Sequence, residues 1–139
     1  MILHLKTKIV TKYCGLFLNT LHIIAKSDKE LELVNAIFRL RLLSIIGFQP
    51  IIGGCSNCNT NKNLVSFSLK NDGFKCEECS KQDKSAITIS ETTKDAIKYI
   101  VLADSKKLYS FEVPDASKKE LEIVSKVYLT EKLEKNYIL

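Results

Sequence analysis

Four of the five cysteines form two closely spaced pairs, and this spacing is the strongest chemical signal in the sequence. Cys55 and Cys58 make one C-x2-C pair, Cys76 and Cys79 make the other, and 17 residues separate the two pairs. A two-residue gap lets both thiolates of a pair bind one ion while backbone amides of the tight turn face the sulfurs. Two such turns complete a tetrahedral shell of four cysteines. The spacing therefore predicts one structural zinc ion.

Other uses of paired cysteines fit the sequence less well. Disulfides are disfavoured in a chain that reads as cytosolic. Thioredoxin-like chemistry would use one C-x-x-C pair and leave the second unexplained. An iron–sulfur cluster also takes four cysteines, but paired knuckles around a hairpin are more typical of zinc. The fifth cysteine, Cys14, is expected to be a small buried apolar residue on a helix.

The sequence offers little from which to build a catalytic site. A shell of four thiolates has no open position for an activated water molecule. His4 and His22 are the only histidines, and neither lies in a nucleophile or metalloprotease motif. There is no P-loop and no G-x-G-x-x-G fingerprint. These observations predict a domain that is not an enzyme.

The cysteine pairs lie in a segment that differs from the chain on either side of it. Residues 51–89 hold an alternating run, Val65–Leu69, followed by Asp72-Gly73 as a turn signal. This pattern predicts a short hairpin between the two knuckles. Helical spacing of apolar residues dominates 1–50 and returns in 90–139. The expected fold is therefore mainly α, a helical bundle with an inserted four-cysteine zinc-knuckle β-hairpin.

The boundaries of the expected helices follow from periodicity and capping. Apolar residues recur at helical spacing over 14–25, and a second helix, apolar over most of its circumference, extends to about residue 46. Such a helix is expected to be the element around which the others pack. The predicted N-caps of the later helices are three serines, Ser27, Ser90 and Ser117, with Asp28 as an alternative to Ser27. Ser27 and Ser117 each precede a glutamate by three residues, which is capping-box spacing.

Composition and charge exclude several other classes of protein. With 139 residues and 45% apolar content, the chain is too short for two catalytic domains and too apolar for intrinsic disorder. Lysines and arginines interrupt the apolar runs, so neither a membrane span nor a secretory signal is expected, and the predicted location is the cytoplasm. The net charge is +5, of which residues 1–50 supply +4 (seven basic, three acidic). That excess is small for autonomous nucleic-acid binding, but it suits a patch for an acidic peptide.

One segment carries a family resemblance. Residues 36–50 read AIFRLRLLSIIGFQP and lead directly into the first C-x-x-C pair. This resembles the bacterial recombination mediator family RecO, whose central helix reads F-x-L-x-L-L, followed by G-[YF]-x-P and the first C-x-x-C. Phe67, Gly73 and the second cysteine pair match the second half of the family's zinc insert. The resemblance covers roughly residues 14–139.

The resemblance implies a role in recombinational DNA repair. Family members bind RecR and the single-stranded DNA-binding protein SSB, anneal strands and help RecA to load. They begin with an OB-fold domain that contributes to DNA binding, and no segment of this sequence is expected to form one. We therefore expect this chain to bind single-stranded DNA weakly, if at all.

Partner docking is the activity that the helical part is expected to keep. In this family the helical domain receives the acidic C-terminal tail of SSB, which ends in an apolar aromatic residue. Such a peptide needs an apolar pocket for its aromatic end and a basic rim for its carboxylates. By analogy with the family, we expect the tail to be bound by seven residues of the N-terminal helices: Lys12, Phe17, Leu21, Lys26, Phe38, Arg39 and Arg41.

Two other functions share the cysteine spacing. A zinc-finger GTPase-activating domain of the Arf type carries a catalytic arginine shortly after its fourth cysteine, but here that position is Lys84, which lacks the bidentate fork. A zinc ribbon that binds nucleic acid directly is the second alternative. Residues 51–90 carry five basic and four acidic residues, and the only aromatic side chains there are Phe67 and Phe74. These are too few for a stacking platform.

Overall fold

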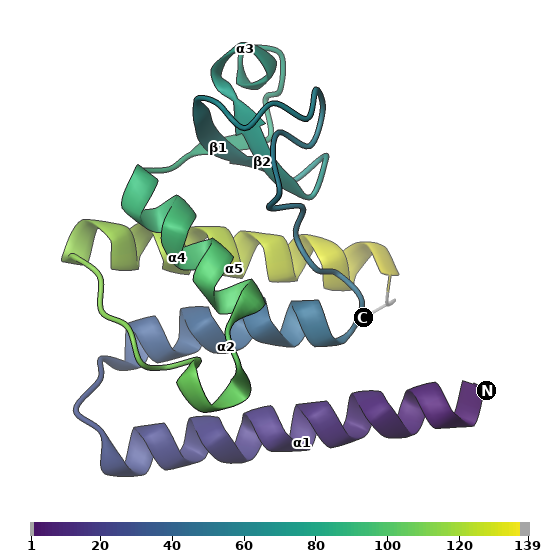
Figure 1. Ribbon diagram of the computed structural model, residues 1–139, viewed down its shortest axis with the longest axis vertical. Helices are drawn as coiled ribbons and strands as arrows, with labels where there is room; N and C mark the ends of the chain where they lie inside the picture. The colour runs from purple at the N-terminus through teal and green to yellow at the C-terminus, as the bar shows by residue number, and fades with distance from the viewer. Residues whose placement is uncertain (1, 137–139) are drawn as a thin grey trace.

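The computed structural model describes residues 2–136, and in that part of the chain it has five α-helices and a small antiparallel sheet. The long helices α1 (Ile2–Lys26), α2 (Leu31–Ile45) and α5 (Asp115–Asn136) form one layer, and α4 (Glu91–Leu102) packs against α2 and α5 (Figure 1). The sheet lies at one end of α4, away from α1 (Figure 1). This arrangement confirms the mainly helical bundle with a four-cysteine β insert.

Helix α2 forms the centre of the core, as its apolar circumference predicts. Helices α1, α4 and α5 all pack against it. Six of its side chains are at most 1% exposed: Leu33, Val34, Ala36, Ile37, Leu40 and Leu43. Burial of each large aliphatic side chain contributes roughly 1.5–3 kcal/mol. Helix α2 is therefore the main source of hydrophobic stabilisation for the bundle.

The predicted cap at Ser90 is confirmed, and the predicted cap at Ser27 is wrong. Ser90 precedes α4, and its hydroxyl accepts a hydrogen bond from the backbone of Thr93 at 3.2 Å. Helix α2 has Glu30 at its N-cap, and that side chain makes no capping bond. The Ser27 hydroxyl instead accepts from the backbone N–H of Lys29 at 3.1 Å, which closes a local turn. This local hydrogen bond competes with the capping geometry.

The predicted cap at Ser117 is also wrong. Helix α5 begins two residues earlier, at Asp115, so Ser117 lies buried in the first turn. Its intended capping partner, Glu120, serves another helix: the Glu120 carboxylate accepts from the Ser90 backbone at 3.1 Å and from the Ser90 hydroxyl at 2.8 Å. The start of α4 is thus fixed by a side chain of α5.

The insert contains the predicted hairpin and one strand that the sequence did not indicate. Strands β1 (Leu64–Ser68) and β2 (Gly73–Cys76) pair antiparallel, and the short helix α3 (Glu77–Ser80) follows. Strand β3 (Ala86–Thr88) pairs with the other edge of β1, which gives the order β2-β1-β3. Strand β1 is therefore the centre of the sheet, with β2 and β3 on its two edges.

Aromatic side chains join the insert to the bundle. Phe67 lies opposite Phe74 in the hairpin, and both side chains are fully buried. The ring of Phe67 also meets the ring of Tyr128 of α5 edge to face, with centroids 5.1 Å apart. The Tyr128 hydroxyl donates to the Phe48 carbonyl at 3.0 Å, just before the chain enters the insert. The insert is therefore part of the same hydrophobic core as the helices.

A buried ion pair lies inside the insert. The Lys75 ammonium is 2.9 Å from the Asp83 carboxylate, and both side chains are at most 7% exposed. Burial raises the pKa of Asp83, but hydrogen bonds from Ser68, Lys75 and Ser85 hold that pKa well below its usual range. The carboxylate therefore stays ionised at neutral and mildly acidic pH.

Gly73 is required by close packing at the start of β2. A Cβ atom at this position would lie 2.4 Å from the backbone oxygen of Ile51, which is closer than any real contact. Ile51 is held there because its N–H donates to Asp72 and its carbonyl accepts from Phe74. A side chain at residue 73 would break this bridge between the chain entering the insert and the hairpin.

We predict that Gly73→Ala destabilises the insert by about 1–3 kcal/mol, because the backbone at Ile51 must move. Gly53→Ala is the matched control, since a Cβ there meets nothing within 4 Å. Chemical denaturation of both variants measures the difference. Equal stability of the two variants would contradict the role assigned to Gly73.

We also predict that Asp83→Asn lowers the free energy of unfolding by about 3–5 kcal/mol, because it leaves the buried Lys75 ammonium without its carboxylate. The pKa of Asp83 is lower in the folded state than in the unfolded state. Its contribution is therefore fully present above about pH 5 and decreases as the pH falls below about 4. Urea denaturation at a series of pH values should show the stability difference between wild type and variant shrinking toward acid. A constant difference would show that the ion pair is not responsible.

Candidate metal centre

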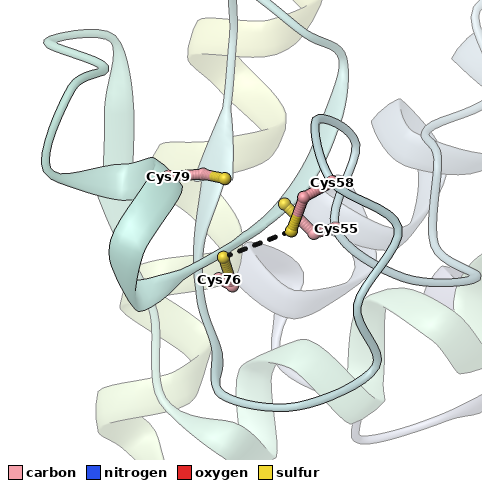
Figure 2. A group of neighbouring side chains, drawn as sticks. All are labelled: Cys55, Cys58, Cys76 and Cys79. Atoms are coloured by element: carbon pink, nitrogen blue, oxygen red, sulfur yellow. Dashed lines mark hydrogen bonds between the residues drawn. The ribbon is translucent and has the colours of Figure 1, made fainter.

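The four paired cysteines converge on one point in the insert. Their sulfur atoms all lie within 4.8 Å of one another, and Figure 2 shows the side chains pointing toward a common centre. Cys55 and Cys58 come from the loop before β1, Cys76 ends β2, and Cys79 lies in α3. The cluster thus draws its ligand atoms from both sides of the hairpin, as the spacing predicts.

Backbone hydrogen bonds shape the first knuckle. The Cys55 N–H donates to Thr60 at 2.8 Å, and the Cys55 carbonyl accepts from Asn59 at 2.9 Å. Asn59 has a φ of 66°, in the left-handed region that asparagine tolerates better than most residues. The Ser56 N–H donates to Phe74 at 2.7 Å, which ties the knuckle to strand β2. These backbone hydrogen bonds hold the loop in a shape that presents both thiols to the cluster.

The sulfur positions fit a tetrahedral ion. Four sulfurs about 2.3 Å from a central zinc ion would lie about 3.8 Å from one another. The Cys58 and Cys76 sulfurs are 3.7 Å apart, a separation much longer than a disulfide bond (Figure 2). The described residues thus form a four-thiol cluster with the dimensions of a metal site.

Two thiols of the cluster, those of Cys55 and Cys79, have pKa values shifted in opposite directions. Burial raises the pKa of Cys55, but hydrogen bonds from three backbone amides and from Cys58 lower it to about 6. The hydrogen bond from Asn57 lowers the pKa of Cys79, while hydrogen bonding with the other three cysteines and burial raise it to about 11. The Cys55 thiolate therefore forms more easily than that of a free cysteine, and the Cys79 thiolate forms less easily. A divalent cation would remove this conflict, because it stabilises all four thiolates together.

Asn57 is a site residue that the sequence analysis missed. Its side-chain amide donates to the Cys79 sulfur at 3.3 Å and so links the first knuckle to the second. Amide hydrogen bonds to a ligand sulfur orient it and reduce its nucleophilicity. The sequence signal that could have identified Asn57 is an amide side chain inside the C-x2-C turn.

Cys14 lies outside the cluster, and the expectation that it is buried is wrong. Its side chain is exposed on α1, because the face of α1 that packs on the bundle carries Leu16 and Thr20 instead. Cys14 is therefore a control position for metal binding, because its thiol is exposed and lies outside the cluster.

The seven residues expected to bind an acidic tail are not all brought together. Lys12 of α1 and Arg41 of α2 line one cavity of about 410 Å³, whose walls include the apolar side chains of Leu16 and Ile45. Arg41 also donates to the carbonyls of Ile100 and Val101 at 3.0 and 3.4 Å, at the C-terminal end of α4. This cavity brings together one of the seven from α1 and one from α2.

The other five residues lie elsewhere. Phe17 and Leu21 are 45% and 46% exposed on α1, about 140° and 180° around the helix from Lys12. Lys26 is exposed at the last residue of α1, and Phe38 is partly buried against the core. Arg39 is half-buried, and its Nη1 atom has no hydrogen-bond partner among the described residues. Leu16 and Ile45 were missed because they read as core positions.

No helix within the described residues has both the length and the apolar composition needed to cross a membrane. Helix α1 has the length, but Lys6, Lys8 and Lys12 lie within it and Lys26 ends it.

Comparison with known proteins gives a consistent result. The family model described as "Recombination protein O C terminal" matches residues 15–138. A DNA repair protein RecO from Acetivibrio thermocellus is 37% identical over 134 residues, which cover 96% of this chain and 53% of that relative. DNA repair proteins RecO from Bacillus cereus and Bacillus anthracis are 26% identical over 112 residues, or 81% of this chain and 45% of theirs. This chain spans about half the length of these relatives. No solved structure matches it.

We predict that Cys55→Ser abolishes stoichiometric metal binding, because Cys55 supplies a buried sulfur of the cluster. Cys14→Ser removes an exposed cysteine outside the cluster and should keep one metal ion per chain. Elemental analysis of both purified variants tests this difference. Loss of metal from both, or from neither, would show that the cluster is not a metal site.

Proposed function

Because this chain belongs to the RecO C-terminal family, we propose that it is a non-enzymatic docking domain of recombinational DNA repair. In this proposal the helical part binds the acidic C-terminal tail of SSB and also engages RecR, so that strand annealing and RecA loading are supported. The family membership places the chain in DNA repair. The cavity between Lys12 and Arg41 is the observation that supports tail docking.

We infer that the metal is zinc and that its role is structural. Cys55, Cys58, Cys76 and Cys79 would hold it as thiolates, and all-sulfur tetrahedral sites favour zinc or iron–sulfur clusters. The two-knuckle arrangement around a hairpin favours zinc. When bound, the ion crosslinks the loop before β1 to helix α3. It offers no open coordination position at which water or a substrate could react. Iron in place of zinc in the elemental analysis would contradict this assignment.

The cavity has the two chemical features that an acidic peptide with an apolar end requires. Leu16 and Ile45 offer an apolar wall, and Lys12 and Arg41 offer positive charge beside it. Arginine and lysine bind carboxylates by charge-assisted hydrogen bonds. Arg41 is already oriented by the carbonyls at the end of α4, so little side-chain entropy is lost when it binds a carboxylate.

The other partners rest on the family alone. The proposal assigns RecR no particular surface, and it expects weak binding of single-stranded DNA, since residues 1–50 carry an excess of only four positive charges. The cytoplasm, where chromosomal recombination takes place, is the proposed location.

The alternative functions receive less support. Lys84, the residue in place of the arginine of Arf-type GTPase-activating domains, is exposed between α3 and β3, and the family membership lies elsewhere. The insert's two phenylalanines are fully buried in the core, so neither offers a ring on which a nucleotide base can stack.

We predict that a labelled peptide with the sequence of the SSB C-terminal tail binds this chain saturably and more weakly at high salt. Lys12→Glu should raise its Kd about tenfold, because it reverses a charge at the cavity rim. Fluorescence anisotropy at two salt concentrations measures both effects.

Lys84→Glu provides the matched control, because it makes the same change of net charge on an exposed lysine of the insert. It should leave the Kd within about twofold once salt screens long-range effects. Arg41 is unsuited to this test, since its substitution also removes the hydrogen bonds to the end of α4. Equal weakening by Lys12→Glu and Lys84→Glu would show that the peptide responds only to net charge, and the cavity assignment would then be wrong.

A further inference from the structure

The four cysteines of the metal centre differ in how well solvent can reach them. Cys55 and Cys76 are buried, at 0% and 6% exposed, whereas Cys79 is half-buried and Cys58 is exposed. A cavity of about 400 Å³ lies beside the cluster, and three of the four cysteines line it: Cys58, Cys76 and Cys79. A small molecule that enters this cavity therefore meets every cysteine of the cluster except Cys55.

Cys58 is the most exposed of the three cysteines in this cavity. The Cys79 sulfur accepts a hydrogen bond from the Asn57 side-chain amide at 3.3 Å, and that amide covers part of the sulfur. Redox-sensitive cysteines are characteristically accessible to solvent and lie next to a second cysteine with which they form a disulfide. Cys58 meets both conditions, because the Cys76 sulfur is 3.7 Å from its own (Figure 2).

Cys76 is the partner that the geometry favours for a disulfide with Cys58. The two sulfurs would approach from 3.7 Å to about 2.0 Å, so each would move by only about 1 Å. Cys55, in the same C-x2-C pair as Cys58, is the alternative partner. It is fully buried and does not line the cavity, and three backbone amides donate hydrogen bonds to its sulfur. These contacts hold Cys55 in place, whereas Cys76 shares the cavity with Cys58.

Charge around the cavity favours an uncharged oxidant. Glu77 and Glu78 are exposed on α3 and line the cavity together with a single basic residue, Lys62. Four thiolates and one divalent ion would add a net charge of about −2 beside them. A negative potential of this kind lowers the local concentration of anions. Hydrogen peroxide is small and uncharged, so this potential does not exclude it.

We propose that Cys58 is a site of oxidation by peroxide, that Cys76 then forms a disulfide with it, and that Asn57 shields Cys79. The Cys58 sulfur attacks one peroxide oxygen, an S–O bond forms, the O–O bond breaks and hydroxide leaves, which gives a sulfenic acid. The Cys76 sulfur then attacks the Cys58 sulfur, so that an S–S bond forms, the S–O bond breaks and a second hydroxide leaves. Two protons from solvent convert the hydroxides into water. Peroxide is thus reduced by two electrons, and two thiolates are oxidised to one disulfide.

This oxidation would release the bound metal ion. Structural zinc sites use four protein ligands, and only Cys55 and Cys79 would remain. Helix α3, which has no buried residue, would lose the tie that Cys79 provides, while the disulfide would keep the end of β2 linked to the first knuckle. The inference rests on the proposed zinc site, and metal analysis before oxidation tests that site separately.

The test uses the zinc-loaded chain in a Cys14→Ser background, which prevents disulfides between chains through the exposed Cys14. After hydrogen peroxide is added, we expect loss of zinc and a Cys58–Cys76 disulfide in peptide mass spectrometry. Dithiothreitol and fresh zinc should then restore one ion per chain. Retention of zinc in excess peroxide, or another main disulfide such as Cys55–Cys58, overturns the proposal. A chain without zinc before oxidation contradicts the proposed metal, and the disulfide map still tests the assignment of Cys58 and Cys76.

Trapping of the sulfenic acid tests the order of the steps and the role of Asn57. With dimedone present, the label should appear on Cys58. Asn57→Ala should add label on Cys79, because it removes the amide that covers this sulfur. Asn61→Ala is the matched control, since Asn61 is exposed in the same loop and does not line the cavity, and its label should stay on Cys58. Zinc content and far-UV circular dichroism of each variant are measured before oxidation. First labelling of Cys76 or Cys79 without these substitutions, or equal labelling of the two variants, contradicts the proposal.

Discussion

Helix α2 imposes the main constraint on this structure, because almost its whole circumference must be shielded from water. Its six most buried side chains are at most 1% exposed, so three other helices are needed to surround it. A helix that packs on another uses only one of its sides, so apolar residues on its other sides must pack elsewhere or stay exposed. Helix α5 uses a second side for the insert, where Tyr128 meets Phe67. Helix α1 uses a single side, and the rest of its apolar surface stays open.

The insert depends on two separate anchors, one at each end. At the cysteine end, four sulfurs within 4.8 Å tie the loop before β1 to α3. At the bundle end, Phe67 and Phe74 join the main core, and Lys132 of α5 forms an ion pair with Asp72 in the hairpin turn. A segment of some forty residues with two aromatic side chains buries too little apolar area to fold unaided. The metal site and the aromatic contact therefore act on different parts of the same small sheet.

Features encoded within a few residues were predictable, and features created by distant segments were not. The C-x2-C pairs, the Ser90 cap and the β1–β2 hairpin rest on local chemistry, and the structure contains all three. The two proposed capping boxes failed for different reasons: the Ser27 hydroxyl accepts a local hydrogen bond from Lys29, and Glu120 binds Ser90, 30 residues away. The cavity between Lys12 and Arg41 unites two antiparallel helices, and nothing local marks its apolar wall. Likewise, helical periodicity shows that α1 has an apolar stripe but not which part of it is covered.

The order of the elements along the chain has a consequence for synthesis on the ribosome. Helix α2 is complete at residue 45, whereas α5, one of its covering helices, ends at residue 136. At about 5–20 residues per second, the intervening 91 residues take roughly 5–20 s to emerge. Until α5 is made, the central helix α2 lacks one of the helices that cover it, and the start of α4 lacks Glu120. The growing chain therefore exposes apolar surface of α2 that the finished fold buries, and α2 is fully covered only when α5 has been made.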